Sequence, residues 1–193
     1  MRQSPAVQGE GQSEVRGAWF VTARSYVEAR WGTETLAQIA EGVTEDRRRA
    51  VTDPIASEWY PEEWLQDTLA AAHRIVAKGD RDAFIEFIEG CTEQGVSRFF
   101  SVLIELSKPA FILSKVPFMW DRVRRGPGRV VVSAGDRGTR LHYSRFPYFG
   151  DPLYRMLTVG SLRAVVRRCT GEEPDVRIVD FSDDECVVDV LHD

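Results

Sequence analysis

The 193-residue chain lacks the sequence patterns by which catalytic and metal sites are recognised. Its three cysteines contain no CxxC pair, which argues against a zinc site or a disulfide framework. The three histidines, His73, His142 and His192, stand in no HxH or HExxH spacing. The chain also has no GxSxG elbow, Walker A loop or GxGxxG turn. We therefore predict no catalytic residue, no metal site and no cofactor.

Long apolar segments are missing as well. No run of residues approaches the length that a membrane-spanning helix needs, about 18 residues. Residues 1–14 have no apolar core of a secretory signal, and we interpret them as a disordered leader before a single domain at 15–193. An odd number of cysteines without a pairing pattern favours a reducing compartment, so we expect a cytoplasmic protein.

Charge is distributed unevenly along the chain, although the net charge is only -5. Residues 107–170 carry 13 Lys and Arg against 3 Asp and Glu, and the rest of the chain is acidic. Such a segment is typical of an anion-binding face, and Arg124, Arg125 and Arg145 are its candidate anion contacts. The alternative is that the two parts interleave in the fold and neutralise each other. A pI of about 5.4 and the absence of a nucleic-acid motif argue against a nucleic-acid partner.

The first 125 residues have helical periodicity. Apolar residues recur every three or four positions in 15–31, and Gly32 interrupts them before a second short helix. A polar helix is expected at 44–51. Pro61 fits the first position of the next helix, which ends at Gly79. A long helix follows from Asp80 to about residue 106, and two short helices follow at 109–115 and 117–125.

In the last third of the chain the sequence pattern changes from helical to that of β-strands. Residues 129–134 and 139–146 form a predicted hairpin around a Gly-rich turn, and 175–181 and 186–192 form a second one. A helix at 153–170 separates the two hairpins. The predicted fold class is therefore α+β, with a helical N-terminal half packed on a four-stranded antiparallel sheet made of two hairpins flanking a helix.

The long helix beginning at Asp80 is apolar on all sides near its C-terminal end, which predicts a central, buried position. We expect it to form one wall of an apolar pocket. The candidate ligand-binding residues are Phe84, Ile88, Cys91, Phe99, Leu103 and Trp120. On this stripe, Cys91 is expected to behave as a small apolar side chain.

Several short stretches carry a resemblance to known proteins. Residues 15–20 (VRGAWF), the Trp59-Tyr60-Pro61 helix start, residues 108–113 (KPAFIL) and the Pro117–Trp120 pair resemble an uncharacterised family abundant in myxobacteria. That family is remotely similar to the superfamily of haem-NO-binding sensors, vinyl-four-reductase domains and TRAPP subunits. The acidic turn before Cys186 is similar to the terminal signature of the vinyl-reductase domains. The resemblance implies a ligand-binding or dimerising α+β domain.

The chain departs from the haem sensors in their ligand set. Those sensors use an axial histidine on a middle helix and a Tyr-x-Ser-x-Arg signature. Here no histidine lies between Asp80 and Arg125, and Tyr143-Ser144-Arg145 has the residue types without the spacing. The vinyl-reductase domains also carry a cysteine before the closing turn that this chain lacks. Both departures agree with the expectation of no cofactor.

Three functional hypotheses follow. The leading one is a non-enzymatic small-molecule-binding or sensory module, which forms a homodimer and binds an apolar ligand among the central helices. The second is a scaffold or adaptor that acts through protein contacts without a ligand, and it requires an exposed apolar patch in place of a pocket. The third is an enzyme, for which His142, Tyr143 and Arg145 would be the first residues to substitute.

Overall fold

The structure is a computed structural model that describes residues 12–105, 108–135 and 137–192, with residues 96–105 described by their backbone alone. Residues 1–11 of the predicted leader lie outside this description. The helices are α1 (Gly17–Glu41), α2 (Arg48–Thr52), α3 (Glu62–Ile75), α4 (Arg81–Glu105), α5 (Pro109–Leu113), α6 (Val116–Val123) and α7 (Pro152–Thr170), with a short 3-10 turn η1 (Glu45–Arg47) before α2. The strands are β1 (Glu14–Arg16), β2 (Trp59–Pro61), β3 (Arg124–Arg125), β4 (Arg129–Gly135), β5 (Gly138–Ser144), β6 (Asp175–Phe181) and β7 (Cys186–Leu191).

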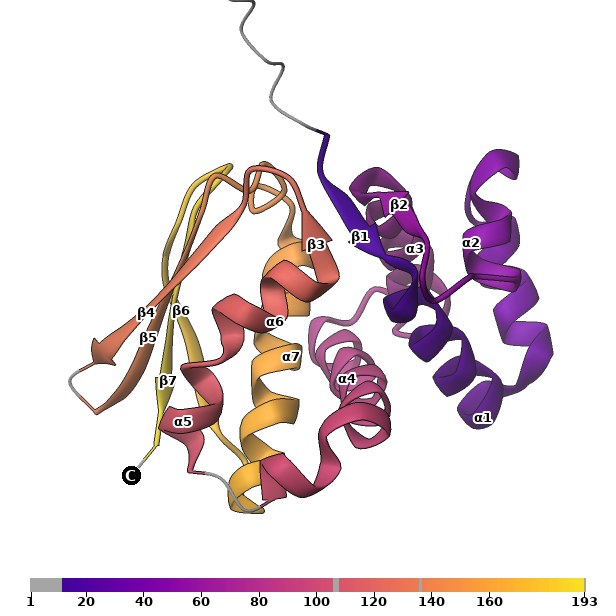
Figure 1. Ribbon diagram of the computed structural model, residues 1–193. Helices are drawn as coiled ribbons and strands as arrows, with labels where there is room; N and C mark the ends of the chain where they lie inside the picture. The colour runs from indigo at the N-terminus through magenta and orange to yellow at the C-terminus, as the bar shows by residue number, and fades with distance from the viewer. Residues whose placement is uncertain (1–11, 106–107, 136, 193) are drawn as a thin grey trace, which may run out of the picture.

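The predicted α+β fold class is confirmed. The larger sheet has the strand order β4-β5-β7-β6, with every neighbouring pair antiparallel, so the two hairpins meet through β5 and β7. Alternate residues of a strand point to opposite faces, and on β7 Cys186, Val188 and Val190 are buried against the helices. Figure 1 shows α7 lying along the inner face of this sheet, with α4 beyond it and α1 to α3 on the far side.

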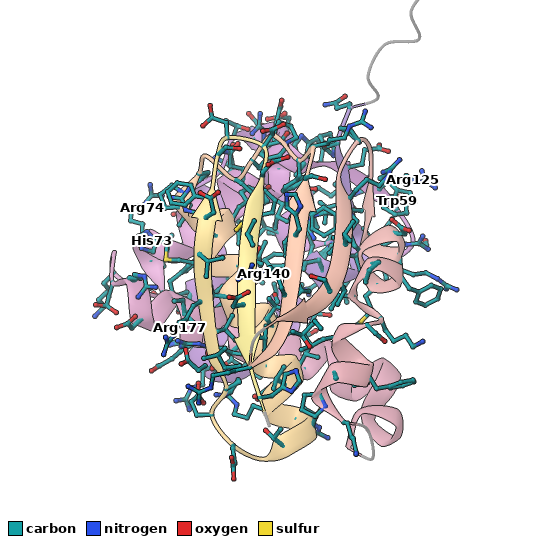
Figure 2. The ribbon with its side chains drawn as sticks, turned by 90° about the vertical axis from the view of Figure 1, so that its left-hand side faces the viewer. Trp59, His73, Arg74, Arg125, Arg140 and Arg177 are labelled. Carbon is teal, nitrogen blue, oxygen red and sulfur yellow. The ribbon has the colours of Figure 1, made fainter. Side chains whose placement is uncertain are left out.

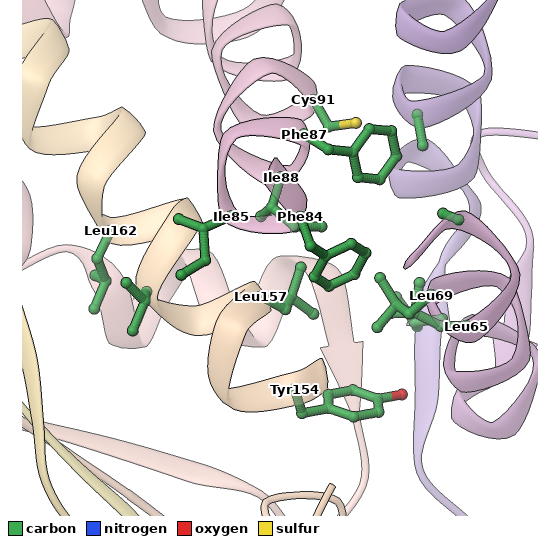
Figure 3. Packing of buried hydrophobic residues seen from close by; sticks show 14 of the residues in the cluster. Leu65, Leu69, Phe84, Ile85, Phe87, Ile88, Cys91, Tyr154, Leu157 and Leu162 are labelled. Carbon is green, nitrogen blue, oxygen red and sulfur yellow. The ribbon is translucent and has the colours of Figure 1, made fainter. Parts of the chain in front are cut away.

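Helix α4 is the centre of the helical part, as its apolar sequence predicted. In Figure 3 Phe84 of α4 lies between Leu69 of α3 and Leu157 of α7. Phe84 is fully buried, so α4 joins the N-terminal helices to the layer that covers the sheet. Helix α7 approaches α4 closely at Gly160, where an added Cβ would lie 2.9 Å from the carbonyl oxygen of Ile85. A glycine is needed there because no side chain fits in that space.

A second, three-stranded sheet was not predicted. Its order is β2-β1-β3, and Val15 in the central strand pairs with Tyr60 on one side and Arg124 on the other. Strand β1 therefore brings together the starts of α1 and α3 and the end of α6. The short strands join three segments that are far apart in the sequence, and this sheet places the polar residues of the site described below.

Several predicted boundaries are wrong because of this small sheet. Val15 lies in β1 and not in the first helix, and Ser13, at the end of the predicted leader, is buried beside it. Pro61 ends β2 and caps α3, which begins one residue later than predicted. Arg124 and Arg125 form β3 and do not continue α6. The predicted interruption at Gly32 is confirmed as a kink within α1, where the glycine has φ of 86°.

Part of the basic segment is paired with acidic residues from other elements. Arg167 of α7 lies 2.8 Å from Glu89 and 2.7 Å from Glu93, both on α4. On the outer face of the large sheet, which Figure 2 views directly, Arg140 forms a bidentate pair with Asp189 at 2.7 Å. Among the described residues, no helix is long and apolar enough to cross a membrane.

Candidate functional site

A pocket of about 300 Å³ lies where α1, α4, α6 and α7 meet the inner side of β5. Its walls are mostly apolar and come from Ala18, Trp19, Met119, Phe149, Leu157 and Leu162, among others. A volume of this size is at the lower end for small-molecule sites, which are concave and mainly apolar with a few polar groups. The predicted pocket wall on α4 is present, because Cys91, Thr92 and Gly95 line it.

The polar end of this pocket is formed by Arg124 on β3. The guanidinium lies over the Trp120 ring at 4.6 Å and over the Phe146 ring at 5.4 Å, and all three residues line the pocket. Its Nε donates to Glu62 Oε1 at 3.4 Å. The side chain of Arg124 is 11% exposed and that of Glu62 is fully buried. The pair therefore places a charged group at the edge of an apolar space.

Glu62 stands at the first position of α3 because β1 holds that helix start in place. Its backbone N–H donates to the carbonyl oxygen of Ser13 at 2.9 Å, and its own carbonyl oxygen accepts from the Tyr154 hydroxyl at 3.0 Å. The second carboxyl oxygen, Oε2, is buried without a hydrogen-bond partner. Burial raises the pKa of Glu62, against the opposing effect of Arg124.

The small hydroxyl groups around the pocket bond to protein atoms. Thr22 donates to the carbonyl oxygen of Ala18 at 2.9 Å, and Thr158 donates to that of Tyr154, also at 2.9 Å. The Thr92 hydroxyl donates to that of Ser161 at 3.3 Å. These bonds between neighbouring turns and helices satisfy the hydroxyls locally, so their methyl groups and stems can form apolar walls.

The pocket reaches the surface beside α6. Phe118 lines it and is 54% exposed, which places this ring at the mouth. The Arg122 guanidinium lies 4.7 Å from the centroid of the Phe118 ring, and Arg122 also lines the pocket. A ligand entering here would pass an aromatic ring and a cation before reaching the apolar interior.

Of the predicted pocket residues, Cys91 and Trp120 line the cavity. Phe84 and Ile88 do not: both are fully buried in the core, one to two turns before Cys91 on α4. They face α3 and α7, because a helix that is buried all round has different neighbours on each side. The side chains of Phe99 and Leu103 lie outside the described part of the chain.

The three predicted anion contacts do not form one surface. Arg124 lines the pocket. Arg125 is exposed, and its guanidinium carbon lies 4.0 Å from the centroid of the Trp59 ring; both residues are labelled in Figure 2. Adjacent residues of a strand point to opposite faces, which separates these two side chains. Arg145 lies in an exposed turn with φ of 59°, away from both.

The residues suggested for an enzyme are also separated. Tyr143 is buried on the inner face of β5 and lines the pocket, while His142 lies on the outer face, 3.6 Å from Glu185. Successive residues of one strand cannot meet in a single site. Among the described residues, no three His, Cys, Asp or Glu side chains gather where they could hold a metal ion.

Three weakly acidic side chains of the pocket wall, Cys91, Tyr143 and Tyr154, have a pKa raised by burial, which favours their neutral forms. Burial raises the pKa of the Cys91 thiol and of the Tyr143 phenol far above their usual ranges. A protonated thiol is a poor nucleophile and a poor metal ligand, so Cys91 contributes apolar surface here.

Part of the lining was not predicted from the sequence. Thr158, Ser161 and Leu162 of α7 face the pocket, but α7 is buried between α4 and the sheet and has no single apolar stripe. Phe146 and Phe149 line the pocket from the loop between β5 and α7. Asp151 begins α7 by accepting from the Leu153 N–H at 2.8 Å, which turns this loop back under the pocket.

Comparisons with known proteins identify the fold. No protein-family model and no curated protein matches the sequence. Among solved structures, an H-NOX protein from S. oneidensis in the Fe(II)NO ligation state is 13% identical with a TM-score of 0.65, covering 92% of this chain and 99% of that one.

Two other H-NOX structures agree with it. The Fe(II) unliganded H-NOX protein from K. algicida is 10% identical with a TM-score of 0.64, covering 91% of this chain and 95% of that one. The H-NOX from Shewanella woodyi, solved with IWP-051 bound in the Fe(II)CO state, is 14% identical with a TM-score of 0.61, covering 92% and 94%. The chain therefore has the fold of the H-NOX proteins, and the remote similarity predicted from the sequence extends to that fold.

Proposed function

We propose that this protein is a non-enzymatic sensory or regulatory module that binds an apolar small molecule in the pocket between α4, α6 and α7. The observation that carries the proposal is the cavity of about 300 Å³ with apolar walls and a mouth at Phe118. The H-NOX proteins of the same fold bind small ligands, as the Fe(II)NO and Fe(II)CO states of their structures indicate. A pocket of this kind favours the binding hypothesis over the scaffold hypothesis.

Haem does not fit the residues of this pocket. None of the three histidines lines it: His73 packs on Phe84, His142 lies on the outer face of the sheet, and His192 bonds to Thr139. Cys91, Tyr143 and Tyr154 would have to bind iron as thiolate or phenolate, and burial disfavours these ionised forms. Met119 also lines the pocket, but the methionine thioether that binds haem iron in cytochromes c does so beside a histidine, and this pocket has none. We therefore propose a ligand that needs no axial side chain.

The proposal is tested with 1-aminoanthracene, a neutral fluorescent probe of apolar cavities. We expect saturable binding to the purified protein, and we expect Thr158→Phe to weaken it about tenfold or more, because the phenyl ring would occupy the cavity. Thr158→Val should bind within about twofold of the wild type, because it is close to threonine in size and loses only a hydroxyl that donates to the Tyr154 carbonyl oxygen of the same helix. Absence of saturable binding, or equal binding by Thr158→Phe, would contradict the proposal.

We further propose that the module acts as a homodimer in the cytoplasm. Val131 on the edge strand β4, and Val179 and Phe181 on the opposite edge strand β6, are each about half exposed or more, so the edges of the large sheet offer apolar side chains to a second copy. All three cysteines are free thiols, in agreement with a reducing compartment. Sedimentation velocity at micromolar concentration tests the dimer, and a single monomeric species at all concentrations would overturn it.

A further inference from the structure

Arg124 is a nearly buried cation in the pocket wall, and among the described residues only its Nε has a hydrogen-bond partner. Arg124 donates through Nε to Glu62, and its guanidinium carbon lies over Trp120 and Phe146, two rings of the pocket wall. A guanidinium presents five N–H donors in a planar fork. The bond to Glu62 at 3.4 Å uses one of them, so the remaining donors of the fork are available to a ligand.

Several other polar groups of the wall have partners in the protein, and the Tyr143 hydroxyl adds a neutral polar group to the lining. The hydroxyls of Thr22, Thr92 and Thr158 donate to neighbouring protein oxygens. The second arginine of the lining, Arg122, is exposed and stacks on Phe118 at the mouth. The interior thus offers a single positively charged fork inside apolar walls, which matches one planar anionic group on an apolar body.

We propose that the ligand is an amphipathic monocarboxylate, such as a medium-chain fatty acid, whose carboxylate pairs with Arg124 while its chain fills the apolar cavity. This inference rests on the proposed function and specifies the chemical class of its ligand. A carboxylate suits the site because it accepts two parallel hydrogen bonds from one guanidinium. An apolar chain suits the walls formed by Leu157, Leu162 and Met119.

Glu62 would compete with a ligand carboxylate for the guanidinium of Arg124. It is fully buried, and Oε2 has no hydrogen-bond partner in the protein. Burial raises the pKa of Glu62, against the lowering effects of Arg124 and of the Tyr154 hydroxyl, and a second carboxylate beside Arg124 would act in the same direction as burial. Tyr154 and the Ser13 carbonyl hold the backbone of Glu62 in place, so the exchange needs no movement of α3.

The experiment compares decanoate with decan-1-ol, which have the same chain and differ in the charged group. Displacement of 1-aminoanthracene gives both affinities. We expect decanoate to bind about tenfold more tightly, since its carboxylate accepts two charge-assisted hydrogen bonds from the guanidinium, whereas the alcohol offers one neutral acceptor. We expect Glu62→Gln to bind decanoate about three- to tenfold more tightly than the wild type, because the competing carboxyl is gone. Tighter binding cannot result from a damaged fold.

Two further variants complete the test. In the double variant Glu62→Leu with Arg124→Met no buried charge is left unpaired, and the preference for decanoate over decan-1-ol should disappear. Arg125→Met, the exposed neighbour on β3, should keep the preference. Equal affinity for the two probes, or weaker decanoate binding by Glu62→Gln, overturns the inference and leaves the proposed function standing. Failure of both probes and of 1-aminoanthracene to bind overturns the proposed function as well.

Discussion

Replacing Arg124 with methionine is expected to lower the free energy of unfolding by about 3–5 kcal/mol, because the change leaves Glu62 as a buried carboxyl without its ion-pair partner. The loss should be large because Glu62 is fully buried and Arg124 is 11% exposed, so water cannot replace the missing guanidinium. Urea unfolding followed by tryptophan fluorescence measures it.

A double-mutant cycle separates this cause from simple loss of packing. Glu62→Leu combined with Arg124→Met removes both charges, and most of the lost stability should return, since well-packed apolar pairs commonly replace buried ion pairs without loss. Arg125→Met makes the same chemical change one residue away, on an exposed side chain stacked on Trp59, and should cost less than about 1 kcal/mol. The cycle also needs Glu62→Leu alone; if the loss in the double variant equals the sum of the losses in the two single variants, the two residues are not coupled.

The substitution Phe84→Ala is expected to lower the free energy of unfolding by about 3–5 kcal/mol while leaving ligand affinity unchanged. Phe84 is fully buried and lies 5.9 Å from Phe87 and 5.1 Å from His73 between ring centroids. Truncation would leave a cavity at the junction of α3, α4 and α7 (Figure 3). Because Phe84 does not line the pocket, the folded variant should bind 1-aminoanthracene within about twofold of the wild type.

Phe118→Ala is expected to have the opposite effects to Phe84→Ala, with little loss of stability and weaker binding of the probe. This phenylalanine is 54% exposed at the mouth of the pocket, so its loss should cost less than about 1 kcal/mol of stability. The affinity of the Phe118→Ala variant for 1-aminoanthracene should fall, since the Phe118 ring forms part of the pocket wall. Urea unfolding and the same fluorescence titration measure both variants. Weaker binding by folded Phe84→Ala and unchanged binding by Phe118→Ala would show that the pocket residues are assigned wrongly.

The fold class could be predicted because its main elements carry local signals. The two hairpins have alternating apolar residues around turn sequences, and pairing within a hairpin needs only neighbouring residues. The helices have apolar stripes, and α7 ends at Gly171 as predicted, whereas α3 ends at Ile75, before the predicted Gly79. These patterns act over a few residues, so the sequence contains what is needed to recognise them.

The small sheet and much of the pocket could not be predicted in this way. Strand β3 has two residues, and its partner β1 is far away in the chain, so no local pattern indicates the pairing. The pocket depends on how four helices meet. Cys91 and Phe84 stand on the same apolar stripe of α4, yet only Cys91 faces the cavity, because the neighbouring helices change between their two positions.

The small sheet also bears on how the chain folds during its synthesis. Val15 pairs with Arg124, about 110 residues later, so β1 cannot acquire its second neighbour until more than half of the chain has left the ribosome. Contacts between distant segments slow folding because a long loop must close before they form. The strand that anchors Glu62 is therefore complete only after α6 is made. We expect the emerging helices α1 to α4 to expose part of their apolar surface until then, which makes early chain termination a route to aggregation.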